Sequence, residues 1–232
     1  MSTPHAASIS DHAGPAEARL RQAFGPRVRR LHARIGKAHH RVEGMEVSRA
    51  LLEGRADPLQ LAALLRDLAP AYALLEREAP HLAAPLGATA IPWRALARST
   101  ALRHDLAVLS VLPATPASAA ADGWLKHLQF LCRQAPHRLM AHVYVRYGGD
   151  LSGGQQLGQQ ANATLAARGL PGLMFWTFER PIARLKQELH DGFEAMDLAA
   201  AEEAELLEEA ELAFRLTQRL LAELAGEAAP AG

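Results

Sequence analysis

The spacing of apolar residues restricts the fold of this 232-residue chain more than any other feature. Between about residues 16 and 42 these residues recur at steps of three and four, at Leu20, Phe24, Val28, Leu31 and Ile35. Side chains at these steps share one face of an α-helix, whereas a half-buried strand needs strict alternation. No alternating run of strand length, rich in β-branched residues, stands out in the sequence. The spacing therefore predicts an all-α fold without a sheet.

Local signals place the ends of the expected helices. A break is expected near Gly25 and Pro26, inside the first periodic stretch. Asp57 followed by Pro58 is typical of a capping residue and a first helical residue, and it predicts a long helix that Pro70 should kink. Further helices are expected at about residues 92–112, 118–133, 137–167, 180–196 and 198–224.

The composition favours one folded domain. Hydrophobic residues make up 49% of the chain, which is enough for a single core at this length. Residues 1–14 and 225–232 are rich in small and polar residues, so we expect a disordered N-terminal segment and a flexible tail around a domain at residues 15–224. Lys plus Arg and Asp plus Glu both number 25, and this balance predicts neither a nucleic-acid partner nor a membrane partner.

The same sequence is typical of a cytoplasmic protein. The single Cys132 cannot form an internal disulfide, as expected in a reducing compartment. No end carries an apolar run of about 18 residues, the length needed to span a bilayer. The first residues, MSTPHAASISDHAGP, lack the charged and then apolar order of a signal peptide. Cytoplasmic localisation is therefore the expectation.

Four glycines interrupt a strong helical pattern in the segment RYGGDLSGGQ, residues 146–155. Each glycine inside a helix costs about 1 kcal/mol relative to alanine, so the four cost about 4 kcal/mol if the segment is helical throughout. Gly149 and Gly153 would share one face, with Asp150 and Gly154 in the adjacent row. A stripe of bare backbone beside a carboxylate would let a flat, bulky ligand lie against the helix.

Two other interpretations of these glycines exist. Residues 151–155, LSGGQ, match the signature motif of ATP-binding-cassette ATPases, but the chain has no GxxxxGK[ST] loop and no predicted sheet to hold one. A plain helix break or a close contact between helices would explain the glycines equally well when they are taken alone. The neighbouring residues favour the ligand site over that explanation.

The segment AHVYVRYGGDLSGGQQL, residues 141–157, resembles the distal-helix motif of the haem oxygenase family, whose usual form is close to AHxYxRYLGDLSGGQ. Gly148 stands where many members have leucine. The segment KAHHRVEG, in which Glu43 follows His39 by four residues, is similar to the proximal HxxxE of the family. Similar segments follow in the expected order over about residues 28–224: LAPAYALLERE around Tyr72, RSTALRHDLAVL at 98–109, GLMFWTF at 172–178 and EEAELAFRLTQRLLAEL at 208–224.

The resemblance implies a fold and a reaction. The fold would be a single all-helical domain that holds haem between a proximal and a distal helix. Haem would be both cofactor and substrate, cleaved with dioxygen at a meso carbon to biliverdin, ferrous iron and carbon monoxide. Electrons would come from a ferredoxin, a flavodoxin or a reductase, and the bilin product could pass to an acceptor such as a phytochrome.

The resemblance also assigns roles to individual residues. His39 would ligate the haem iron, and Glu43 would orient its imidazole. Asp150 would organise distal water and deliver protons through it, with Tyr72 and Arg146 completing the polar network. The remaining expected haem contacts are Tyr144, Gly149, Ser152, Gly153, Gly154, Phe175, Lys186 and Phe214. Ordinary packing on helix faces is the competing explanation for the aromatic and cationic members of this set.

Two departures from the family pattern concern the haem propionates, which should meet cations at the mouth of the pocket. His32 stands where the family has a basic residue seven positions before the proximal histidine, and His190 replaces an arginine four positions after Lys186. Arg30 or Arg34 could substitute for the missing charge, with Arg184 near Lys186.

Two rival functions remain on the sequence alone. A haem carrier or storage protein would keep His39 but would need neither Asp150 nor the glycine stripe. An enzyme resembling the thiamin-degrading family would need a nucleophilic cysteine with a base beside it. Cys132 has only Arg133 as an adjacent charge, so a small buried apolar role fits it better.

Overall fold

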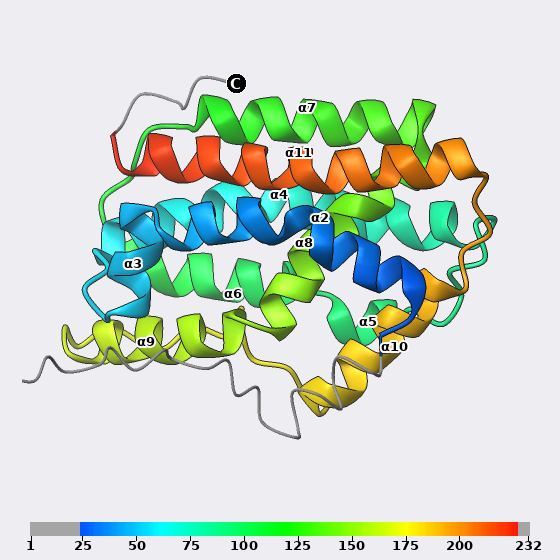
Figure 1. The fold of residues 1–232 in the computed structure, drawn as a ribbon. Helices are drawn as coiled ribbons and strands as arrows, with labels where there is room; N and C mark the ends of the chain where they lie inside the picture. Colours follow the sequence, from blue (N-terminus) through cyan, green and yellow to red (C-terminus); the bar gives the residue numbers. More distant parts are fainter. Residues whose placement is uncertain (1–23, 227–232) are drawn as a thin grey trace, which may run out of the picture.

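Helices α8 and α11 lie at the centre of a bundle that a computed structural model describes for residues 24–226 (Figure 1). The helices are α2 (Pro26–Glu43), α3 (Glu46–Leu52), α4 (Pro58–Ala83), α5 (Trp93–Leu96), α6 (Ser99–Val108), the 3-10 helix η1 (Leu109–Val111), α7 (Ala119–Gln134), α8 (Pro136–Leu151), α9 (Gly154–Ala166), α10 (Ile182–Glu194) and α11 (Ala200–Leu224). Residues 24–226 contain no strand, so the all-α prediction is confirmed. The predictions for residues 1–14 and 227–232 lie outside the described residues.

The expected helix starts are correct at two informative positions. Pro26 is the first residue of α2, as expected from the break beside Gly25. Asp57 caps α4, since its side chain accepts a hydrogen bond from the backbone N–H of Leu59 at 2.9 Å. The same helix runs on to Ala83, through Pro70.

The predicted helix at 92–112 is wrong, because the chain forms α5, α6 and η1 there. Ala97 leaves helical geometry with ψ at 131°, and α6 then starts afresh. The carboxylate of Glu76 on α4 stabilises this start by accepting hydrogen bonds from the backbone N–H groups of Arg98 and Ser99. The short α3 was not predicted either.

The predicted single helix at 137–167 is also wrong. α8 ends at Leu151, Ser152 departs from helical geometry with φ −105° and ψ −93°, and α9 begins at Gly154. Only Gly148 and Gly149 therefore lie inside a helix and carry the full glycine cost. The helical pattern continued through residue 152 because both halves are amphipathic, so periodicity could not show the break.

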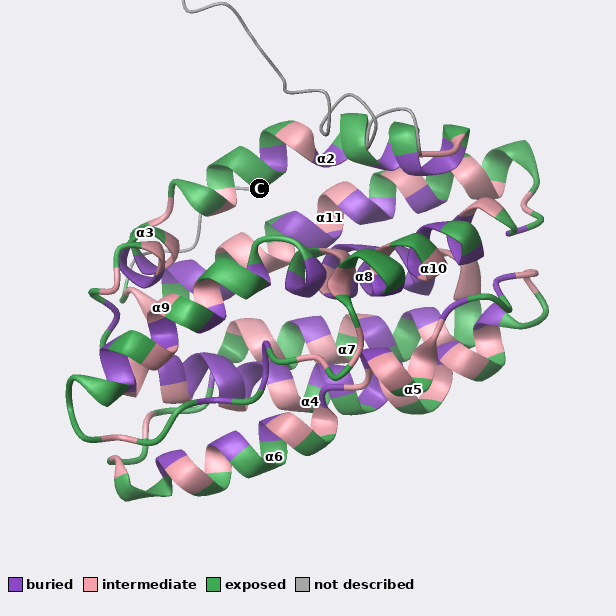
Figure 2. Cartoon of the chain, turned by 90° about the horizontal axis from the view of Figure 1, so that it is seen from below, coloured by how far each residue is buried: buried purple, intermediate pink, exposed green. Residues whose placement is uncertain are grey.

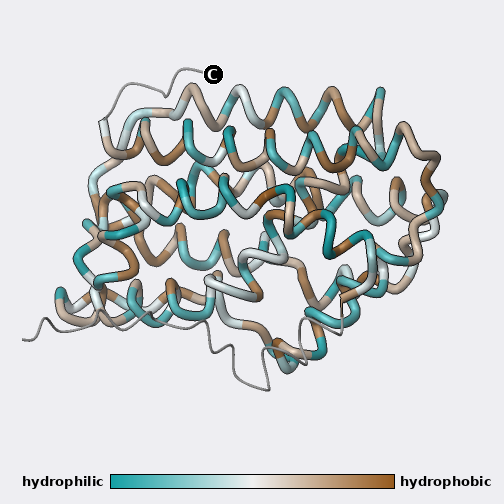
Figure 3. Tube along the Cα trace, in the orientation of Figure 1, coloured by the Kyte–Doolittle hydropathy of each residue, from teal (hydrophilic) through white to brown (hydrophobic). Residues whose placement is uncertain are grey.

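The core forms where α8 crosses the bundle. Residues 139–145 of α8 are all buried, and this helix packs against α4, α7, α10 and α11 (Figure 2). Other helices carry both hydrophobic and hydrophilic residues along their length, as Figure 3 shows for α2 and α11. The glycine-rich motif is thus carried by the most enclosed helix of the bundle.

The beginning of α2 is fixed by the buried Arg27. Its guanidinium donates to Glu203 Oε2 at 2.6 Å and to the carbonyl oxygens of Phe193 and Met196 at 2.6 and 2.8 Å. The Glu194 carboxylate caps the same end by accepting from the backbone N–H of Val28 at 2.7 Å. These bonds tie the start of α2 to α10 and α11.

No helix within residues 24–226 is long and apolar enough to cross a membrane.

Candidate functional site

Two adjoining cavities open between α2, α8 and α11. The inner cavity has a volume of about 180 Å³ and the outer cavity about 340 Å³. Both are lined by His39, Val145, Gly149 and Phe214, so they meet along a shared wall. Apolar side chains dominate the inner cavity, among them Val42, Leu51, Leu64, Leu68, Leu157 and Leu220. The outer cavity instead holds polar and basic groups.

His39 is the histidine that faces both cavities. Its ring packs edge-on against Phe214 with centroids 5.8 Å apart, and its side chain is 50% exposed. His40 lines only the outer cavity and is 81% exposed. Glu43 Oε2 lies 3.4 Å from His39 Nδ1 and 3.3 Å from His40 Nδ1, so it is close to both imidazoles. The pairing with Nδ1 leaves His39 Nε2 as the nitrogen for a metal.

Asp150 lies on the opposite wall, from α8, and is buried. Its Oδ2 accepts a hydrogen bond from the Tyr72 hydroxyl at 2.6 Å, which joins two residues 78 positions apart. Burial raises the pKa of Asp150 to about 6, although the charge of Arg146 and the bond from Tyr72 both act to lower it. The carboxyl group can therefore exchange a proton close to neutral pH.

Tyr72 is the only predicted site residue that lines neither cavity. It is fully buried behind Asp150, edge-on to Phe175 at 5.3 Å and to Tyr147 at 5.6 Å. Burial and the charge of Asp150 raise its pKa well above the usual value. The Tyr72 hydroxyl therefore stays protonated and holds the carboxylate by donating to it.

Arg146 brings a positive charge to the inner cavity. Its Nε is buried and has no hydrogen-bond partner within residues 24–226, while its guanidinium lies 5.8 Å from the ring centroid of Trp124. An unpaired buried donor beside a cavity is costly unless water or a ligand accepts from it. The charge of Arg146 also acts on Asp150, whose pKa it lowers.

Three glycines leave the distal wall bare. A β-carbon added at Gly148, Gly149 or Gly153 would meet no atom within 4 Å, and each of the three lines a cavity. Gly154 differs, because its β-carbon would come within 2.8 Å of Trp176 Cδ1. Gly154 therefore allows close packing with Trp176, as the close-contact explanation expected, while the other three leave open space.

Gly149→Ala is expected to stabilise the free protein by about 1 kcal/mol, since α8 is helical there, and to weaken haem binding by filling the bare wall. Gly123→Ala is the matched control, because Gly123 lies inside α7, away from both cavities, and its added β-carbon also meets nothing. Thermal unfolding and haem titration of both variants would test this. Equal haem affinity of the two variants would contradict the proposed role of Gly149.

The outer cavity gathers the expected polar contacts. Tyr144, Ser152 and Lys186 line it, and so do His32 and His190. Burial lowers the pKa of Lys186 and raises that of Tyr144. The structure thus brings Lys186 to the predicted mouth of the site, next to the two histidines that stand at the family's basic positions.

The arginines expected to replace those charges do not line the outer cavity. Arg30 pairs with Glu203 at 2.7 Å, and Arg34 pairs with Glu211 at 3.0 Å, both on the α11 side of α2. Arg184 is 73% exposed and lies 3.3 Å from Glu188. The expectation that Arg30 or Arg34 substitutes for the basic residue is therefore not supported by where they lie.

The family profile described as Heme oxygenase matches residues 28–223. The chain belongs to the haem oxygenase family. Heme oxygenase 1 of Pongo abelii is 32% identical over 201 residues, which cover 81% of this chain and 68% of that relative. The fold agrees with a heme oxygenase structure from Leptospira interrogans (TM-score 0.78, 25% identity, 86% of this chain and 100% of the other). It also agrees with heme oxygenase-1 from Synechocystis sp. PCC6803 in complex with heme (TM-score 0.79, 24% identity, 87% and 93% covered).

Membership of this enzyme family confirms the predicted fold and the enzyme prediction. It favours a catalytic function over a haem carrier and leaves no reason to invoke Cys132 as a nucleophile. Burial raises the pKa of the Cys132 thiol, which makes it less reactive.

Sequence reasoning missed the clamp that holds one wall of the inner cavity. The buried Asp105 accepts hydrogen bonds from the backbone N–H groups of Met174 and Phe175 at 2.8 Å, and Arg98 donates to the Phe175 carbonyl oxygen at 3.2 Å. Phe175 and Trp176 thereby stay against the cavity. A lone Asp at position 105 inside a helix-forming segment was the only available signal.

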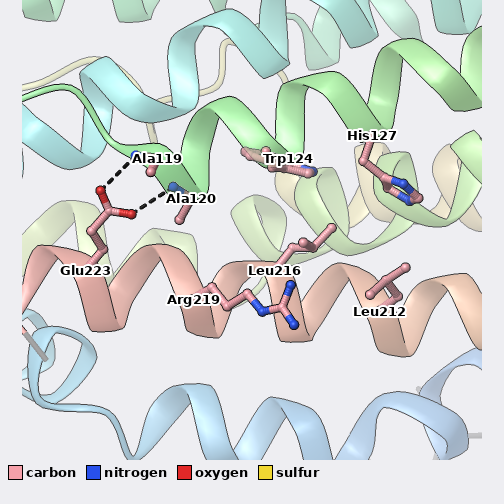
Figure 4. A pocket seen from close by; sticks show the side chains of 9 residues that line it. Ala119, Ala120, Trp124, His127, Leu212, Leu216, Arg219 and Glu223 are labelled. Atoms are coloured by element: carbon pink, nitrogen blue, oxygen red, sulfur yellow. Dashed lines mark hydrogen bonds between the residues drawn. The ribbon is translucent and has the colours of Figure 1, made fainter. Parts of the chain in front are cut away.

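A third cavity of about 610 Å³ lies on another side of the bundle, between α7 and α11 (Figure 4). Trp124 and His127 on α7 face Leu216 and Arg219 on α11 across it. At one end the Glu223 carboxylate accepts from two backbone N–H groups at the start of α7, each at 2.8 Å. None of the predicted site residues lines this cavity.

A buried cluster around Glu209 adjoins that third cavity. Glu209 Oε1 lies 2.7 Å from His127 Nε2 and 2.8 Å from His142 Nε2, and Arg138 donates to Oε2. These His and Glu atoms are close enough to hold a metal. Trp124 Nε1 donates to His142 Nδ1 at 3.2 Å, however, which puts the His142 proton on Nε2, where a metal would bind. The cluster is therefore a closed hydrogen-bond network.

Proposed function

We propose that this protein cleaves haem at a meso carbon with dioxygen and reducing equivalents, releasing biliverdin, ferrous iron and carbon monoxide. The observation that carries the proposal is the pair of opposed walls: His39 on one side, and bare Gly149 beside the buried, ionisable Asp150 on the other. Bound haem supplies the iron that activates dioxygen and the carbon that is oxidised. A carrier would use His39 but would have no need of an ionisable group held opposite it.

Residues on one wall of the site hold the haem iron, and residues on the other wall leave room for the macrocycle. His39 Nε2 binds the iron, and Glu43 near Nδ1 keeps the imidazole electron-rich and orients it. On the distal side the bare backbone of Gly149 and Gly153 lets the flat macrocycle approach. Apolar side chains along the inner cavity exclude bulk water from the reacting edge.

Proton delivery falls to the distal polar residues. Asp150, held by Tyr72, would take up or release protons through water on the distal side of haem, because its pKa lies near 6. Arg146 adds a positive charge beside the same carboxyl group. Ser152, Tyr144 and Lys186 contact the haem edge in the outer cavity, while Gly154, Phe175 and Phe214 complete the walls.

Electrons come from a separate donor, a ferredoxin, a flavodoxin or a reductase, and the bilin passes to an acceptor such as a phytochrome. The neutral net charge fits a cytoplasmic enzyme without nucleic-acid or membrane partners.

Turnover with a defined electron supply tests the proposal. The purified protein, loaded with one haem, is incubated with NADPH, a ferredoxin and its reductase, with catalase present to remove free hydrogen peroxide. Biliverdin, identified by chromatography and absorption, and an equal amount of carbon monoxide are expected. Haem that stays intact while the donor is oxidised would overturn the proposal and favour the carrier function.

A further inference from the structure

Three nitrogen bases converge on the outer cavity from two helices. His32 on α2 and His190 on α10 have ring centroids 6.4 Å apart, and Lys186 on α10 lines the same space. Phe24 fixes the two histidines by stacking on His32 at 5.1 Å and lying edge-on to His190 at 4.7 Å. Tyr144 on α8 contacts both rings from the other side, at 6.0 and 6.3 Å. The bases are thus held in place around a common opening.

No carboxylate within residues 24–226 forms an ion pair with any of these three bases. The nearby acidic groups are engaged elsewhere. Asp191 accepts a hydrogen bond from the Gln187 amide at 2.7 Å, and Glu194 caps the start of α2. The other titratable groups that line the outer cavity are His39 and His40 on α2 and the Tyr144 hydroxyl. The cluster therefore has the donors of an anion site without an anion from the described part of the chain.

The free protein keeps both histidines neutral at pH 7. Burial lowers the pKa of His190 to about 4, and the charges of His32 and Lys186 act in the same direction. Burial also lowers the pKa of His32, helped by the charges of Lys186 and His39. Of these three bases, Lys186 is therefore the one that carries a positive charge near neutral pH.

We infer that His32 and His190 take up protons when the two carboxylates of haem dock beside them and Lys186, where the family resemblance already places those carboxylates. The inference rests on the proposed function, since haem is the ligand that binds in both cavities. Haem has an apolar macrocycle and two carboxylates at one edge, and the chain has an apolar inner cavity that adjoins a basic outer cavity. Permanent cations do not replace the histidines, because Arg30 and Arg34 pair with Glu203 and Glu211.

The direction in which haem affinity changes with pH follows from the pKa values of the two histidines in the free and the haem-bound protein. Two carboxylates beside His32 and His190 favour their charged forms, so each pKa rises when haem binds. Groups that gain protons on binding make affinity fall as pH rises, by up to about tenfold per pH unit for each histidine. Ligation by His39 has the opposite sign, because a metal needs its neutral form, but this contribution is common to variants that keep His39.

Haem affinity is measured from pH 6.5 to 8.5 for the wild type and for the double variant His32→Gln/His190→Gln, which keeps polar side chains that do not titrate. The wild type is expected to lose at least about tenfold more affinity than the double variant over this range. Calorimetry in two buffers of different ionisation enthalpy should show more protons taken up per haem by the wild type. Haem with both carboxylates esterified should abolish this difference between the two proteins.

His81→Gln provides the matched control, because His81 lies on α4, is exposed and lines neither cavity. It should leave proton uptake unchanged, and thermal unfolding of the free variants shows that each is folded. Equal proton uptake by the wild type and the double variant, with the iron–imidazole signal intact, would overturn the inference alone. A wild type that binds no haem through His39 would overturn the proposed function and this inference with it.

Discussion

Asp150→Asn is expected to bind haem with His39 still ligated and to lose biliverdin formation by about two to four orders of magnitude. The size follows from the usual contribution of general acid–base catalysis. An amide at this position accepts the hydrogen bond from Tyr72 but cannot readily relay a proton. Single-turnover oxidation of the haem complex, with chromatographic analysis of the pigment, measures the loss.

The variant should remain folded, so a loss of biliverdin formation would not be due to unfolding. Burial disfavours the charged form of Asp150, so replacing it with a neutral isostere removes an unfavourable buried charge at pH 7. Below pH 6 the benefit disappears, because the wild-type carboxyl group is then protonated and neutral. Undiminished biliverdin formation by both Asp150→Asn and Asp150→Ala would remove Asp150 from the mechanism.

Tyr72→Phe tests the same proton exchange through a milder change, because it keeps the Asp150 carboxyl group and alters only its pKa. The Tyr72 hydroxyl lowers the pKa of Asp150 by donating to its carboxylate, so removing the hydroxyl should move that pKa above about 6. The pH profile of turnover should shift towards higher pH, with a smaller loss of the maximal rate than in Asp150→Asn. A purely structural role of Tyr72 would lower the rate at every pH without moving the profile.

His39→Ala is expected to abolish the iron–imidazole signal, whereas His40→Ala should retain it. His39 lines both cavities and packs on Phe214, while His40 lines only the outer one and is largely exposed. Resonance Raman and optical spectra of the haem complexes provide the measurement. His40→Ala is a stringent control, because both imidazoles lie within 3.4 Å of the same Glu43 oxygen. Loss of the signal in His40→Ala alone would show that the ligand is the neighbouring residue.

The helices were predictable from the sequence where one residue determines the local geometry. Asp57 and Pro58 show this, since capping and the fixed φ of proline act within one turn. The end of α8 at Leu151 was not predictable in the same way. Ser152 bends where the chain must pass from the buried α8 to α9, whose Gly154 and Gly158 pack on Trp176. That constraint comes from a loop about 20 residues further along the chain.

For the candidate site, too, features carried by one sequence segment were predictable, and most contacts between distant segments were not. The motif resemblance placed the residues lining both cavities, because local sequence carries them on α2 and α8. It also put Tyr72 in the polar network of Asp150, and the two residues are hydrogen-bonded across 78 positions. It could not show that Glu43 lies close to two histidines. Nor could it show that Arg30 and Arg34 pair with glutamates on α11. These outcomes depend on which helix faces meet, and spacing within one helix does not determine that.

The contacts of Arg27 fix the beginning of α2, and His39 lies near the other end of the same helix. His39 lies 12 residues further along, about 18 Å from Arg27 at 1.5 Å per residue. A tilt of about 5° there displaces the imidazole by about 1.5 Å, which is enough to separate a ligand from a metal. The position of His39 therefore depends on contacts made at the far end of its helix, where Arg27 is bound.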